Sequence, residues 1–144
     1  MEKLMELIGK GQKLAEKRSW LSKGYNDLIN KINESLAQIP DMPEDDIEYT
    51  LKTWSHDNNY GTLQRKITIN LVFDGDAFIV MRLNKENPAC NWDVSDIKEP
   101  STKNIRLFAS KFPQIIDFFI NEVDKINTDN QLAIDTITRL LAKL

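Results

Sequence analysis

The chain contains few residues of the types that perform catalysis. His56 is its one histidine and Cys90 its one cysteine. A catalytic nucleophile needs a neighbouring base. His56 falls in a turn-rich stretch, residues 55–61, where we expect a solvated loop residue, with a general base as the alternative. Cys90 lies close to Trp92 and is expected to be a small buried hydrophobe rather than a reactive thiol. We therefore predict no catalytic residues and no enzyme, and a small enzyme that uses His56 or the aspartates ranks last among the alternatives.

Metal and cofactor motifs are also missing. An acidic cluster between residues 41 and 48 lacks the spacing and the central glycine of an EF-hand calcium loop. A zinc site needs several cysteine or histidine ligands, and the chain has one of each. The tripeptide at residues 9–11, Gly-Lys-Gly, is only a fragment of a phosphate-binding loop. The sequence thus predicts no metal and no cofactor.

Basic and aromatic side chains gather in the middle of the sequence, and they are the candidate interaction residues. Such a mixture can bind the backbone and bases of a nucleic acid. Arg65 and Lys66, however, are adjacent in a predicted strand and face opposite ways, and the net charge of −3 gives no long-range attraction to phosphate. Aromatic and arginine side chains also dominate protein interfaces. The candidates are Trp54, Tyr60, Arg65, Lys66, Arg82, Trp92 and Arg106.

A long N-terminal helix is predicted for residues 2–39. Apolar residues recur there at alternating spacings of three and four, and a second apolar row beside them widens the face. Gly24 is a candidate break, because glycine destabilises a helix interior. Pro40 and Pro43 end the segment. The main row comprises Leu4, Leu7, Gly11, Leu14, Arg18, Leu21, Tyr25, Leu28, Ile32, Ser35 and Ile39.

Residues 47–94 are predicted to form a three- to four-stranded antiparallel meander. Odd positions from Leu63 to Phe73 are mostly apolar and the even ones mostly polar, which is typical of a strand with one buried face. Asp74-Gly75 follows directly, and this pair before a second apolar run is a strong hairpin signal. An earlier strand is expected from residue 47 to residue 54, and a short fourth strand near residues 90–94.

Two to three C-terminal helices are predicted for residues 101–144, packed with the N-terminal helix. Ser101 or Thr102 can cap the first. Pro113 marks a new start or a kink. The apolar period of three and four returns from Ile116, and Thr128 with Gln131 could form a capping box where a last helix begins.

We expect an α+β fold with all 144 residues in a single domain, because this is a common domain length and composition is ordinary for a globular protein. The mixed charges of the first six residues and the lack of long apolar stretches predict a cytoplasmic protein with no secretory leader and no membrane contact. The abundance of Lys, Asn, Ile and Asp is typical of an AT-rich bacterial or phage genome.

The leading hypothesis is a non-enzymatic protein-binding module that is homodimeric through its long helices. A small regulator, adaptor or inhibitor fits, and one form of it is a phage- or mobile-element-encoded inhibitor of a host system. Its partner would be another protein of unknown identity. The alternative is a nucleic-acid-binding accessory protein that uses the basic sheet surface.

Overall fold

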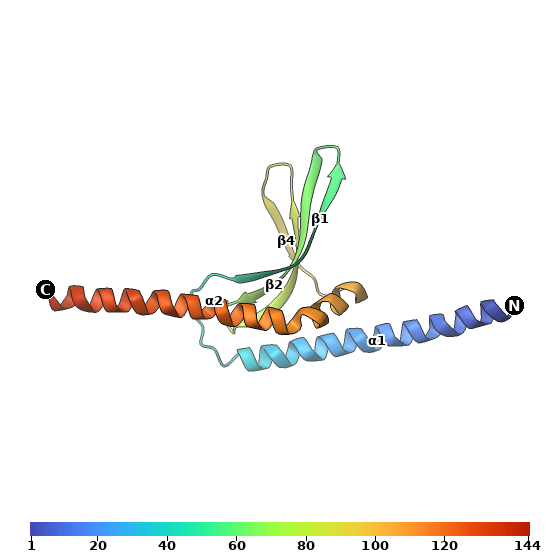
Figure 1. Ribbon diagram of the computed structural model, residues 1–144, viewed down its shortest axis with the longest axis horizontal. Coiled ribbons are helices and arrows are strands. Elements are labelled where there is room, and N and C mark those ends of the chain that lie inside the picture. Colours follow the sequence, from blue (N-terminus) through green and yellow to red (C-terminus); the bar gives the residue numbers. More distant parts are fainter. The chain divides into compact units, whose positions relative to one another are not determined.

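The computed structural model describes residues 1–144 and has an α+β architecture. Helix α1 (Glu2–Leu36) precedes four strands, β1 (Ile47–Asn58), β2 (Gly61–Val72), β3 (Phe78–Glu86) and β4 (Trp92–Asp96), and helix α2 (Thr102–Ala142) follows them (Figure 1). The chain divides into two compact units, residues 1–110 and residues 111–144. The predicted single domain therefore stays a prediction. Neither helix contains a stretch long and apolar enough to cross a membrane.

Helix α1 is continuous, so the candidate break at Gly24 does not occur. A glycine costs about 1 kcal/mol in a helix interior, and its neighbours on α1 offset that cost: Tyr25 is buried beside it. The helix ends at Leu36, and the amides of Ala37 and Ile39 close its last turn on the carbonyls of Asn33 and Leu36.

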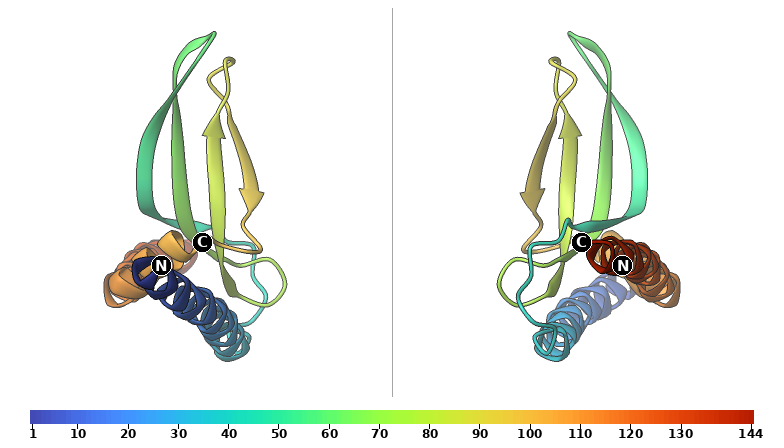
Figure 2. Two further views of the ribbon diagram at one scale, coloured as in Figure 1. Left: turned by 90° about the vertical axis from the view of Figure 1, so that its right-hand side faces the viewer. Right: turned by 90° about the vertical axis from the view of Figure 1, so that its left-hand side faces the viewer.

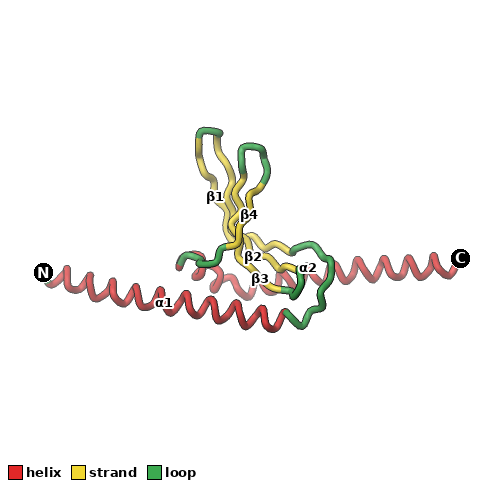
Figure 3. The backbone as a smooth tube through the Cα atoms, turned by 180° about the vertical axis from the view of Figure 1, so that it is seen from behind, coloured by secondary structure: helices red, strands yellow, loops and turns green.

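The four strands form one antiparallel sheet in the order β1-β2-β3-β4, which confirms the meander (Figure 3). Strand β1 is longer than predicted and includes His56, which pairs with Leu63 across a tight turn at Gly61. Gly61 has a φ of 104° and Gly75 a φ of 73°, which glycine adopts without strain. Gly75 lies in a loop longer than a two-residue turn, because β2 ends at Val72 and β3 begins at Phe78.

The two faces of the sheet differ in chemistry. One face carries Ile67, Ile69, Leu71, Ile79 and Met81, all buried. The other carries Thr68, Asn70 and Asn84, which are buried although they are polar. Figure 2 shows the free ends of the β1–β2 and β3–β4 hairpins pointing away from α1. The hairpin ends are exposed, and the buried apolar residues of the sheet lie nearer its opposite end.

Helix α1 is joined to the sheet and to the start of α2 by specific contacts. The Asn33 side chain donates to the Ile79 carbonyl at 3.4 Å and accepts from the Ile79 amide at 2.8 Å. Strand β4 pairs only with residues 82–86 of β3, so Asn33 satisfies a part of the β3 edge that β4 does not cover. The rings of Tyr25 and Phe108 meet edge to face at 5.4 Å. Within the first unit, α1 thus contacts the beginning of α2 at Phe108.

The prediction of two to three C-terminal helices is wrong, because α2 is one helix. It begins as expected, with the Ser101 hydroxyl accepting from the Asn104 amide at 3.2 Å. Pro113 lies inside it and removes one backbone hydrogen bond. Burial of Phe108 and Ile115 on either side favours continuing the helix more than the lost bond disfavours it. The Thr128 hydroxyl donates to the Asp124 carbonyl at 3.0 Å, a bond of threonine within a helix rather than at its start.

Candidate interaction surfaces

Three features of the molecule could carry a function: the polar face of the sheet, a cavity beside α1, and the exposed apolar faces of the helices. No three histidine, cysteine, aspartate or glutamate side chains gather in a way that could hold a metal ion. The surfaces are therefore described by what they could bind.

The polar sheet face, which we define as Thr68, Asn70, Asn84, Lys66 and Arg82, is built on a buried hydrogen-bond chain. The Asn84 amide donates to the Thr68 hydroxyl at 3.0 Å, and that hydroxyl donates to the Asn70 side-chain carbonyl at 2.7 Å. Buried polar groups left without such partners would destabilise the fold. Sequence reasoning missed this chain, because an alternating strand pattern assigns its polar positions to solvent.

Lys66 and Arg82 lie on the same sheet face as these hydrogen bonds, and both side chains are paired with carboxylates. Lys66 contacts Glu48 at 2.9 Å, and its ammonium group lies 4.9 Å from the centroid of the Trp92 ring. Arg82 contacts Asp46 at 2.9 Å and Asp96 at 3.0 Å. Partial burial lowers the pKa of the Arg82 guanidinium, but the hydrogen bonds and charges of Asp96 and Asp46 outweigh it, and the pKa is raised. Two cations thus face three carboxylates, which disfavours a phosphate ligand here.

The other candidate residues lie elsewhere. Arg65 pairs with Trp54 across the sheet on the face opposite Lys66, as predicted. Lys52, which sequence reasoning did not select, lies 5.0 Å from the Trp54 ring centroid. Tyr60 is exposed at the turn between β1 and β2, and Arg106 is exposed on α2. The structure therefore brings together Lys66 with Trp92, and Trp54 with Arg65, but no single surface contains all seven.

The two residues considered for catalysis are both exposed. His56 lies on β1 instead of in a loop. Cys90 was expected to be buried, and that prediction is wrong: it is exposed in the turn between β3 and β4 with a φ of 62°. Asn87 shapes this turn, since its side-chain oxygen accepts from the amides of Ala89 and Asn91. A turn that must place a residue in the left-handed region leaves the side chain at position 90 in solvent.

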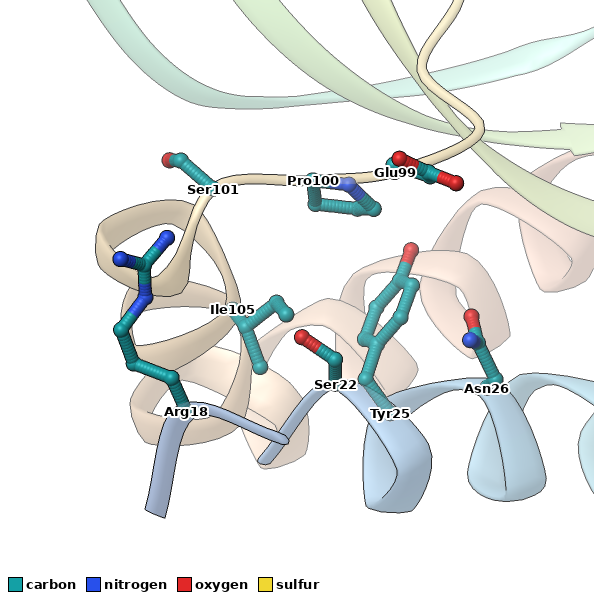
Figure 4. A pocket seen from close by; sticks show the side chains of 8 residues that line it. All are labelled: Arg18, Ser22, Tyr25, Asn26, Glu99, Pro100, Ser101 and Ile105. Atoms are coloured by element: carbon teal, nitrogen blue, oxygen red, sulfur yellow. The ribbon is translucent and has the colours of Figure 1, made fainter. Parts of the chain in front are cut away.

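A polar cavity of about 390 Å³ lies between α1 and the segment that leads into α2 (Figure 4). Arg18, Ser22, Tyr25 and Asn26 line it from α1, and Glu99, Pro100, Ser101 and Ile105 from the other side. Arg18 donates from Nε to the Thr102 hydroxyl at 3.2 Å. Burial raises the pKa of Tyr25 to about 12, so its hydroxyl stays protonated. The lining offers hydrogen bonds, and it holds neither histidine nor cysteine.

The helices expose long apolar faces. Leu7, Leu14, Leu21 and Leu28 repeat at every seventh position of α1, and we call them the leucine column. Leu7 is 66% exposed and Leu14 is 59% exposed. Near the end of α2, Ile137 is 55% exposed and Leu140 is 56% exposed. Residues of this kind in contiguous exposed rows mark interaction surfaces rather than ordinary solvated surface.

The leucine column leads into an apolar groove of about 190 Å³ at the junction of α1 and the start of α2. Gly24 helps to open the groove, because nothing lies within 4 Å of where its Cβ would be. Trp20 lines the groove, and its side chain is largely exposed. The groove could accept an apolar side chain from a partner. Its lining comprises Trp20, Leu21, Gly24, Tyr25, Leu28, Ile105, Phe108 and Ala109.

Comparisons of the chain with protein-family models, with curated proteins and with solved structures found no match.

Proposed function

We propose that this chain is a non-enzymatic protein-binding module that acts through the exposed apolar faces of its helices. A small regulator, adaptor or inhibitor, assembled as a homodimer, fits this proposal. The observation that carries it is the exposure of Leu7, Leu14 and Leu28 in the leucine column and of the apolar residues near the end of α2. Burying such side chains contributes roughly 1.5–3 kcal/mol each, so a partner that covers several of them gains substantial binding energy.

The alternative, a nucleic-acid-binding accessory protein, has less support. It depends on free cationic side chains on the sheet, and Lys66 and Arg82 are engaged with Glu48, Asp46 and Asp96. Arg65 lies on the opposite face. A steep loss of binding with rising salt would be its signature.

The test is light scattering coupled to size exclusion on the full chain, with absorbance recorded at two wavelengths to detect nucleic acid. We expect the wild type to elute with the mass of a dimer. The double variant Leu14→Gln/Leu140→Gln should elute as a monomer with unchanged far-ultraviolet circular dichroism, because glutamine and leucine have similar helix propensities.

Matched controls test whether the apolar rows that contain Leu14 and Leu140 are needed, or whether loss of any exposed apolar residue has the same effect. Met5 and Leu132 are also exposed but lie off the apolar rows, so Met5→Gln/Leu132→Gln should leave the mass unchanged. A wild type that is monomeric at every concentration would contradict self-association through these faces. Nucleic acid that co-elutes and is removed by salt would favour the alternative.

A further inference from the structure

We infer that the polar cavity beside α1 binds a small zwitterion of the size of a short peptide, with its carboxylate toward Arg18 and its ammonium group toward Glu99. This site is separate from the apolar helix faces on which the proposed function rests. All the residues that line the cavity belong to the first compact unit, residues 1–110, so one chain supplies the whole site. Its volume of about 390 Å³ is within the usual range for small-molecule sites, roughly 300–1,000 Å³.

The Tyr25 hydroxyl is the group that most directly indicates a ligand. The side chain is only 8% exposed, and its hydroxyl points into the cavity (Figure 4). The Tyr25 ring packs against Phe108, but the hydroxyl forms no hydrogen bond with any other group of the chain. Because burial raises the pKa of Tyr25 to about 12, the hydroxyl keeps its proton and can donate it. Polar groups in such positions usually have a hydrogen-bond partner, and a ligand in the cavity would supply one.

The end of the cavity at Arg18 suits a carboxylate. Arg18 donates from Nε to the Thr102 hydroxyl at 3.2 Å, which holds the guanidinium group at the first turn of α2 and leaves its other donors unpaired. The Ser101 hydroxyl accepts from the Asn104 amide, so its own hydrogen remains available to a ligand. The backbone amides of the first turn of α2 add positive partial charge at this end.

The opposite end of the cavity suits an ammonium group. Figure 4 shows Glu99 and Arg18 at opposite ends, and the two side chains form no ion pair with each other. A phosphate or a second carboxylate would bring negative charge close to Glu99, and an apolar ligand would leave the polar lining unsatisfied. A zwitterion matches both ends. The chain from Glu99 to Thr102 spans about 10 Å at most, and an extended tripeptide has the same reach.

The test uses triglycine as the probe, titrated into the isotope-labelled full chain and followed by amide chemical shifts. We expect shift changes at residues 22–26 and 99–105 and a dissociation constant of about 1 mM, which is ordinary for a ligand of this size. Acetylating the amino end or amidating the carboxyl end should each weaken binding about tenfold, because each removes a charge-assisted contact. Tyr25→Phe should weaken binding of triglycine about fivefold and leave the circular dichroism unchanged.

Two variants assign the ends of the ligand. Arg18→Gln should bind triglycine and its amide equally weakly, because the partner of the carboxylate is gone, and it should still discriminate against the acetylated peptide. Glu99→Gln should show the reverse selectivity. Lys17→Gln and Glu16→Gln are matched controls, since both residues are exposed on α1 outside the cavity lining and should bind as the wild type does.

The outcomes separate the ligand class from the site. Equal binding of triglycine and its acetylated form would mean that the cavity takes a simple carboxylate, such as the end of a protein chain, and would overturn the inference. Equal binding of triglycine and its amide would overturn it as well. Shift changes only outside the cavity, or no binding at about 10 mM, tenfold above the expected constant, would overturn the site itself. The proposed function stands in each case, because it is tested by the mass of the assembly.

Discussion

Burial of Tyr25 couples the stability of the first unit to alkaline pH. Its hydroxyl lies in a poorly solvated site, and loss of water raises the pKa of Tyr25 from the ordinary value of 10.0 to about 12. An unfolded tyrosine ionises near pH 10. The stabilising contribution is therefore fully present below pH 10 and is lost as the pH rises through 12, by about 2 kcal/mol.

Urea unfolding at pH 9 and near pH 11.5 measures this loss. Other groups titrate over the same range, so the comparison is with Tyr25→Phe, which should lose less stability than the wild type over this interval. Tyr60→Phe is the matched control, because Tyr60 is exposed and its replacement should leave the wild-type pH dependence intact. An identical pH dependence for Tyr25→Phe and the wild type would refute the assignment.

At the scale of elements, Asn33 is the side chain that attaches α1 to the sheet edge. Asn33→Ala removes both hydrogen bonds between Asn33 and Ile79, and it leaves the backbone amide of Ile79 without its acceptor. We expect the free energy of unfolding to fall by about 2 kcal/mol, since an unsatisfied backbone group in a partly buried site is costly. Hydrogen exchange at the Ile79 amide should accelerate more than at neighbouring amides.

Asn30→Ala provides the control for this change, because Asn30 is on the same helix but exposed. It should alter stability by no more than about 0.5 kcal/mol. An equally large loss for Asn30→Ala would contradict this assignment, because helix propensity favours alanine over asparagine and cannot cause a loss at either position.

The elements also show how far the sequence could be interpreted. Regular alternation and the three-and-four period predict β2 and α1 well, because each is a local property of neighbouring residues. Pro113 is ambiguous in the same local terms, and burial at Phe108 and Ile115 on either side of it favours one helix. Thr128 is equally ambiguous, and its hydroxyl donates to Asp124 within the helix. The burial of Phe108 and Ile115 depends on tertiary packing, which the local sequence pattern around Pro113 does not determine.

The candidate surfaces were harder to predict than the elements. The separation of Arg65 from Lys66 follows from alternation alone and is confirmed. The ion pairs are not local: Asp46 and Asp96 are far apart in the sequence and meet at Arg82 only once the sheet has formed. The buried bond between Thr68 and Asn84 likewise depends on the register of β2 with β3. Long-range register determines these contacts, and composition cannot supply it.

At the scale of the whole molecule, self-association makes thermal stability depend on protein concentration. A partner that binds the folded chain but not the unfolded one stabilises it by mass action. For a dimer of this size, a tenfold increase in concentration should raise the Tm by about 2 °C. Calorimetry across two decades of concentration measures the effect.

The double variant Leu14→Gln/Leu140→Gln should unfold at a Tm that does not change with concentration, because its helices no longer bury each other's apolar rows. A constant Tm for the wild type would mean that the exposed leucines do not mediate assembly. In that case, their exposure would have to be explained by a different protein partner, and the polar sheet face and the groove at Trp20 would become the surfaces to test first.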